Sequence, residues 1–232
     1  MLCADDDQVG LARHRKAHVS EPEKKIRARV HKSRRVFVHN DLSHAAMYFA
    51  DNIQEKLDRG SRDAIMFDGV ACAVMVAFTF EANVNFMGFE LNKAGKLPTW
   101  KERESFMDRL KKVFGALGIR VELDKRPLKS MERMKVLRDT LARGKPAYAE
   151  YDQIELGYHE ELDRGAELLA GWEPECTSGS VFEARADLEE LWKLMVEKSG
   201  LDIWDTITTG DGGITFIEHV DPSTPSTHPK KT

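Results

Sequence analysis

The sequence predicts an all-α protein, a compact bundle of four to five helices with a long irregular excursion between the fourth and fifth helices. Apolar residues recur at three- and four-residue intervals in several separate segments, which is the spacing of one helix face. Glycine or proline follows these segments, as expected where helices end. One segment is apolar on nearly every side, which is typical of a helix at the centre of a core.

The first two helices lie in the first half of the chain. Asn40 or Asp41 can cap a helix with regularly spaced apolar residues, and Gly60 ends it. The second helix is predicted from about residue 63 to residue 92, and it carries the longest apolar run, residues 69–80. Because this run is too short to span a bilayer, it is interpreted as a buried core helix and no membrane contact is expected.

The third and fourth helices follow a connecting segment. The third is predicted to open at residues 99–102, which have the capping-box spacing, and to stop at Gly118. The fourth is predicted over residues 128–143. Gly144 and Pro146 then supply a helix C-terminus and a residue that cannot continue a helix.

Residues 145–179 form the predicted excursion. They contain several glycines and a proline among short amphipathic pieces, and we expect one short helix around residues 160–169. A fifth helix is predicted to open at the capping box that begins at Ser180 and to stop near Gly200.

Charge divides the chain into three parts. Residues 1–35 form a polar arm predicted to be disordered, residues 36–206 the helical domain, and residues 207–232 a disordered tail. Between Arg13 and Arg35 there are ten lysines and arginines against two glutamates, although the whole chain has a formal net charge of −4. Such an arm either binds nucleic acid or an acidic surface, or is a solvated, flexible terminus.

Cysteine usage and the N-terminal composition predict a cytoplasmic protein. Cys3, Cys72 and Cys176 are far apart and odd in number, so neither a disulfide framework nor a zinc site is expected. The N-terminus has no apolar signal-peptide core, and acidic residues near it argue against a transit peptide.

The fourth helix contains an arginine in an unexpected position. On a helical wheel Arg138 falls in the apolar sector of this helix, whereas Asp139 falls on the charged face, at salt-bridge spacing from Lys135 and Arg143. Burying an unpaired guanidinium is costly, so Arg138 requires a carboxylate, a ligand or a partner subunit, unless its side chain snorkels to the surface. We predict that it contacts Glu81, which follows the apolar run, with Asn85 alongside.

Three segments resemble the HEPN superfamily of helical, often dimeric proteins: residues 80–86, residues 100–103 and the sequence LRDTLARGKP at 137–146. Many members are metal-independent endoribonucleases of toxin–antitoxin and other defence systems, with a signature of the type R-N-x-L-A-H-G-K-P. The resemblance implies an RNA ligand, no cofactor, a homodimer, and an antitoxin or nucleotidyltransferase-like partner.

The same resemblance assigns candidate site residues. Arg138 and Asp139 match the catalytic signature positions, and Arg138, Arg143 and Lys145 are candidate phosphate ligands, with Glu81 and Asn85 in support. Arg143 stands where the signature has histidine. A guanidinium stays protonated and cannot act as a general base, although it can bind phosphate. We therefore expect phosphate affinity with impaired or absent cleavage, and no metal.

Three functions follow from these observations. The first is an RNA-binding or regulatory module of a defence or toxin–antitoxin type system with a degenerate ribonuclease motif. The second is an active metal-independent endoribonuclease with a divergent site. The third is a structural or protein-interaction domain in which Arg138 pairs internally with Glu81.

Overall fold

A computed structural model describes residues 25–154, 156–159, 168–221 and 223–225. The chain divides into two compact units. The helical unit comprises residues 34–209, close to the predicted domain of 36–206. The ribbon unit combines the segments before and after it.

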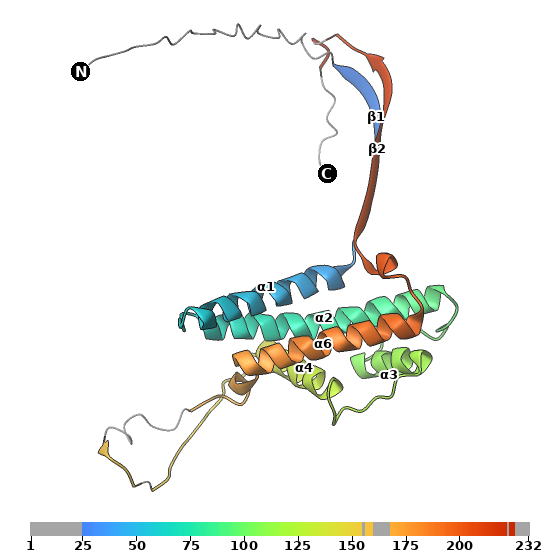
Figure 1. The fold of residues 1–232 in the computed structure, drawn as a ribbon. Helices are drawn as coiled ribbons and strands as arrows, with labels where there is room; N and C mark the ends of the chain where they lie inside the picture. Colours follow the sequence, from blue (N-terminus) through green and yellow to red (C-terminus); the bar gives the residue numbers. More distant parts are fainter. Residues whose placement is uncertain (1–24, 155, 160–167, 222, 226–232) are drawn as a thin grey trace, which may run out of the picture. The chain divides into compact units, whose positions relative to one another are not determined.

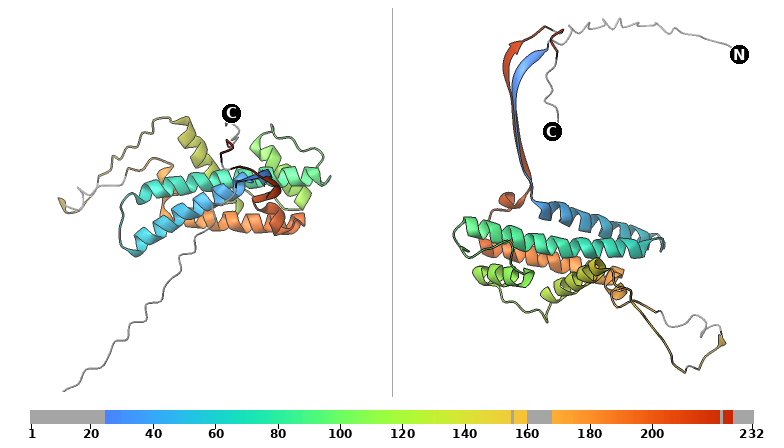
Figure 2. Two further views of the ribbon diagram at one scale, coloured as in Figure 1. Left: turned by 90° about the horizontal axis from the view of Figure 1, so that it is seen from above. Right: turned by 180° about the vertical axis from the view of Figure 1, so that it is seen from behind.

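The helical unit is a bundle with α2 at its centre. This helix packs against the other long helices, and the views agree that α1 and α6 run beside it while the shorter α3 and α4 lie on another side (Figures 1 and 2). The predicted helical bundle is therefore present. The helices are α1 (Val38–Asp58), α2 (Ile65–Lys93), α3 (Phe106–Leu117), α4 (Leu128–Arg143) and α6 (Ser178–Ser199), with short 3-10 helices η1 (Glu173–Cys176) and η2 (Ile203–Thr206).

The core forms around α2 because this helix is apolar on most of its faces. By length and composition α2 would be able to cross a membrane, but core helices of soluble proteins pass the same test, and 39% of its apolar window is buried inside the protein. Its buried side chains meet those of the surrounding helices in one cluster. Fully buried members of that cluster include Ile53, Val76, Met87, Leu110, Phe114, Met134 and Met195.

The third helix begins later than the sequence predicted. Residues 99–104 form turns, and α3 starts after Ser105, whose hydroxyl accepts a hydrogen bond from the Asp108 backbone N–H at 3.2 Å. The predicted capping box is not used because Trp100 packs directly on α2. A Cβ at Gly88 would lie 2.3 Å from the Trp100 ring, so only a glycine leaves room for the indole there.

The ends of α4 and α6 agree more closely with the prediction. Gly144 adopts a left-handed conformation with φ of 58° and terminates α4. Helix α6 starts two residues before Ser180, after the Thr177 side chain, which caps it. Between α4 and η1 the described residues contain no strand, and the only helical residue among them is His159, directly before the range 160–167. Residues 160–167, which hold most of the predicted short helix, lie outside the described residues.

The ribbon unit corrects the all-α prediction. Strands β1 (Ile26–Arg35) and β2 (Thr209–His219) pair with each other in antiparallel orientation; the Val220 N–H donates to the Lys25 carbonyl, and Arg27 faces Glu218. The sequence predicts residues 26–35 and 209–219 as parts of the disordered arm and tail. The ribbon could not be predicted from the sequence for two reasons. Basic residues interrupt the apolar positions of β1, and its partner strand is distant in sequence, so no hairpin turn indicates the pair.

His39 joins the start of α1 to η2. Its ring is buried, Nε2 lies 3.1 Å from the Thr206 carbonyl oxygen, and its centroid lies 4.5 Å from that of Phe86 and 4.9 Å from that of Trp192. Burial lowers the pKa of His39 to about 4, although the Thr206 carbonyl and Asp41 oppose this shift. The imidazole is therefore neutral at neutral pH. Since a carbonyl oxygen only accepts, Nε2 carries the proton and Nδ1 is an acceptor.

Acidification is expected to destabilise the protein through His39. Between its ordinary pKa of 6.5 and its folded pKa of about 4, the unfolded chain binds the proton more readily, so stability that is complete above pH 6.5 is lost as pH falls. After allowance for partial solvation of the ring, we expect a loss of about 2 kcal/mol. Urea unfolding at a series of pH values measures it. His39→Gln should flatten the profile in this window, whereas the exposed His44→Gln on the same helix should not; equal profiles for all three proteins would refute the assignment.

Candidate phosphate-binding site

Arg138 points from α4 toward α2. Its Nη1 donates to Glu81 Oε2 at 2.7 Å, and the side chain is only 18% exposed. The predicted contact between Arg138 and Glu81 is thus confirmed. A carboxylate supplied by α2 explains how the apolar sector of α4 accommodates a guanidinium, because each partly buried charge has an opposite charge in direct contact.

The remaining nitrogens of Arg138 are also occupied. Nε and Nη2 approach Asp139 Oδ1 at 3.0 Å and 2.8 Å, and Lys135 Nζ binds the other Asp139 oxygen at 2.9 Å. The guanidinium carbon lies 5.4 Å from the centre of the Phe78 ring. Every nitrogen of Arg138 therefore has a partner within the protein, and a phosphate would have to displace at least one carboxylate.

Arg109 on α3 is a second guanidinium at this site. Its Nη2 donates to Glu81 Oε1 at 2.8 Å and its Nη1 donates to Asn85 Oδ1. Asn85 thus joins the site through Arg109, not beside Arg138 as predicted. Arg109 lies at the edge of the apolar face of α3, one turn after Phe106 and one turn before Val113, so a helical wheel gives a weaker signal for it than for Arg138.

We call these five residues the Glu81 cluster: Glu81, Asn85, Arg109, Arg138 and Asp139. Burial alone would raise the pKa of Glu81, but hydrogen bonds from Arg138 and Arg109 and their charges outweigh it, so this pKa lies below its ordinary value. The Lys135 hydrogen bond is the main reason that the pKa of Asp139 is also lowered. Both carboxylates are therefore ionised at neutral pH, where they neutralise the two guanidinium groups.

The side chains of the Glu81 cluster are poorly suited to proton transfer. A guanidinium does not lose its proton, and carboxylates with lowered pKa are weak bases. Among the described residues no histidine contacts the cluster. The described ranges also contain no group of three or more His, Cys, Asp or Glu side chains positioned to hold a metal ion.

Arg143 and Lys145 lie apart from this cluster at the end of α4. Both side chains are exposed, and within the described part of the chain neither forms a hydrogen bond or an ion pair. The expected surface pair between Lys135 and Asp139 is present, whereas Arg143 does not pair with Asp139. Of the three predicted phosphate ligands, Arg138 is bound by Glu81 and Asp139, and Arg143 and Lys145 are open to solvent.

A second ionic network holds α4 from another side. The Arg126 side chain binds Asp187 of α6 through two nitrogens, at 2.9 Å and 2.7 Å, and the buried Ser130 hydroxyl donates to the same carboxylate. Arg133 of α4 donates to Glu175 at 2.9 Å and to Glu183 at 3.1 Å. Most charged side chains of α4 thus have structural partners.

The fold and these contacts define a helical bundle with an internally neutralised pair of arginines. The chain matches no protein-family model, no curated protein and no solved structure. The resemblance to the HEPN superfamily therefore stays a prediction that depends on the quoted residues.

Proposed function

We propose that the protein is a HEPN-like RNA-binding module that does not cleave RNA. The observation that carries this proposal is the set of unpaired cations on strand β1. Strand β1 has five basic side chains, and β2 has only two acidic ones, Asp211 and Glu218. The basic residues are Arg27, Arg29, Lys32, Arg34 and Arg35.

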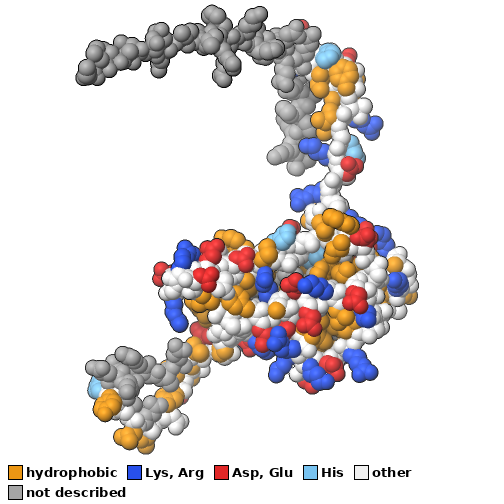
Figure 3. Space-filling view, in the orientation of Figure 1, with side chains coloured by type: hydrophobic (Ala, Val, Ile, Leu, Met, Phe, Trp, Pro, Cys, Tyr) orange, Lys and Arg blue, Asp and Glu red, His pale blue; other side chains and the backbone are white. Residues whose placement is uncertain are grey.

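Three of these cations are available to a ligand. Arg27 pairs with Glu218 and Arg35 pairs with Glu90, but Arg29, Lys32 and Arg34 form no ion pair within the described residues. All three are exposed, with Arg29 on one face of the strand and Lys32 and Arg34 on the other. Phe216 of β2 is also exposed, and Figure 3 shows hydrophobic and basic side chains along the ribbon. Cations that follow a backbone beside an aromatic ring on which bases stack are typical of single-stranded nucleic-acid binding.

The absence of cleavage follows from the two arginines at the signature positions. Arg138 is held by Glu81 and Asp139, so it is not free to orient a phosphate, and Arg143 cannot accept a proton. The resemblance further supports a homodimer and a cognate antitoxin or nucleotidyltransferase-like partner. A protein-interaction domain is the second candidate, because the ribbon also exposes Ile214 and Ile217.

Salt dependence of RNA binding is the test. Fluorescence anisotropy with a labelled single-stranded RNA should give an affinity that falls linearly on a logarithmic salt scale. The triple variant Arg29→Gln, Lys32→Gln and Arg34→Gln should weaken binding and reduce the magnitude of the slope by about 2, since each phosphate contact contributes about 0.7. The wild-type protein should leave the RNA intact without metal.

A matched control removes the same charge from the helical unit. Lys101, Arg103 and Lys111 are exposed and, among the described residues, unpaired, so their replacement by glutamine should leave the slope unchanged. Equal losses from both triple variants would mean that the ribbon is not the RNA contact. Absence of RNA binding at low salt would favour the protein-interaction function, and RNA cleavage abolished by Arg138→Ala would show an active ribonuclease.

A further inference from the structure

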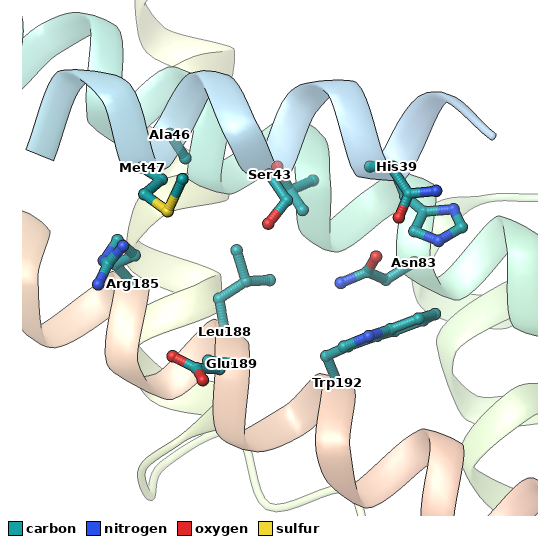
Figure 4. Close-up of a pocket in the computed structure, with 11 residues that line it drawn as sticks. His39, Ser43, Ala46, Met47, Asn83, Arg185, Leu188, Glu189 and Trp192 are labelled. Atoms are coloured by element: carbon teal, nitrogen blue, oxygen red, sulfur yellow. The ribbon is translucent and has the colours of Figure 1, made fainter. Parts of the chain in front are cut away.

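Helices α1, α2 and α6 line a cavity of about 450 Å³ that the Glu81 cluster does not share (Figure 4). Thr79 and Asn83 face it from α2, whereas Glu81, two residues from each, points to the opposite side of that helix. A cavity of this size is within the range that holds small-molecule ligands.

Helix α6 lines the cavity with one of its faces. Arg185, Leu188, Glu189 and Trp192 are spaced at three-, four- and seven-residue intervals, which brings them to the same side. The helical rise separates Arg185 from Trp192 by about 10 Å along the axis. A cation and a large aromatic ring thus stand at two ends of one cavity.

The side-chain amide of Asn83 faces this cavity without a hydrogen-bond partner among the described residues. The residue is 3% exposed. Figure 4 shows the amide directed into the space between α1 and α6. The Asn83 amide is not among the fully enclosed polar atoms of the described residues, so solvent in the cavity can reach it. It can both donate to and accept from a ligand that has adjacent donor and acceptor atoms.

The cation at the other end is available as well. Arg185 is half-buried and forms no hydrogen bond or ion pair among the described residues. Glu189 is its acidic neighbour in the cavity wall, but Glu189 pairs with Lys193 at 2.8 Å. The neutral His39 ring, 4.9 Å from Trp192, completes an aromatic end that carries no charge of its own at neutral pH.

We propose that this cavity binds one nucleotide, with the base at Trp192 and His39, its hydrogen-bonding edge at the Asn83 amide, and the phosphate at Arg185. The separation of the two ends favours a nucleotide over a small aromatic acid, whose anionic group lies close to its ring. The nucleotide is either free or one unit of a single-stranded RNA. This inference uses none of the ribbon residues and does not depend on RNA binding by the ribbon.

Calorimetric titration of the full chain with the four nucleoside 5′-monophosphates tests the proposal. At least one should bind about tenfold more tightly than its nucleoside, and Arg185→Gln should reduce its affinity to that of the nucleoside. Arg120→Gln, at an exposed arginine outside the cavity, should leave the affinity unchanged. No binding of any monophosphate at millimolar concentration, or binding only of an aromatic acid such as indole-3-acetate, would overturn the proposal.

A second variant separates binding from folding. Asn83→Leu keeps the branched shape of the side chain and removes the amide, so it should abolish nucleotide binding, while an unchanged melting temperature of the free protein shows that the variant still folds. Retained binding in this variant would overturn the assignment. A short oligoribonucleotide that binds more tightly than the monophosphate, and loses this advantage in Asn83→Leu, would identify the nucleotide as part of an RNA strand; preference for the monophosphate would identify a free nucleotide.

Discussion

Replacement of Asp187 by alanine is expected to lower the free energy of unfolding by about 3 kcal/mol. The carboxylate is 2% exposed and accepts hydrogen bonds from Arg126 and from the fully buried Ser130. Alanine would leave the Ser130 hydroxyl with only the longer contact to Glu183 Oε1 at 3.4 Å and create a small void between α4 and α6. Arg126, whose side chain is 54% exposed, would keep its ion pair with Glu183 at 3.2 Å.

Urea denaturation at neutral pH measures this loss. The control is Glu190→Ala, an exposed acid three residues further along α6, which should change stability by less than about 0.5 kcal/mol. Arg126→Gln should fall between the two, because it removes the charge but leaves Ser130 bound to Asp187. If Asp187→Ala were no more damaging than Glu190→Ala, the network between α4 and α6 would contribute little to the fold.

The sequence sufficed to predict most of the helices and one partly buried ion pair. Helical periodicity depends on neighbours three and four residues apart, so α2 and α4 could be located from local sequence. The pairing of Arg138 with Glu81 could be predicted because each stood out as a charge within or beside an apolar surface. A charged residue within an otherwise apolar helix face indicates a partner elsewhere in the structure even when the fold is unknown.

Other features depend on contacts that local sequence does not encode. The ribbon pairs Lys25 with Val220, and nothing near either segment indicates this partner. Residues 99–104 do not join α3, and Trp100 packs its indole against α2 where Gly88 leaves room for it. This contact joins two segments that are distant in the sequence. The nucleotide-sized cavity likewise requires the relative placement of three helices, and Asn83 alone gave no signal of it. Arg109 stands at the edge of the apolar face of α3, where periodicity gives only a weak signal.

Glu81→Gln is expected to lower the free energy of unfolding and to raise the affinity for RNA. Glu81 neutralises two guanidinium groups whose side chains are 11% and 18% exposed, so its loss should cost about 2–3 kcal/mol of unfolding free energy. The same change releases a positive charge at the position that matches the signature arginine. If Arg138 then reaches solvent, RNA affinity at low salt should rise severalfold.

The double variant Glu81→Gln with Arg138→Gln distinguishes a blocked phosphate site from a purely structural ion pair. In either case a double-mutant cycle on unfolding free energy should give a coupling of about 1–3 kcal/mol, because the two side chains are in direct contact at 2.7 Å. Only a blocked phosphate site predicts that Arg138→Gln also cancels the gain in RNA affinity. Arg138→Gln alone should then leave RNA affinity unchanged, since Glu81 and Asp139 already occupy that guanidinium. A loss of RNA binding in this single variant would instead mean that Arg138 contacts RNA despite its ion pairs, and the inference that Glu81 blocks the site would be wrong.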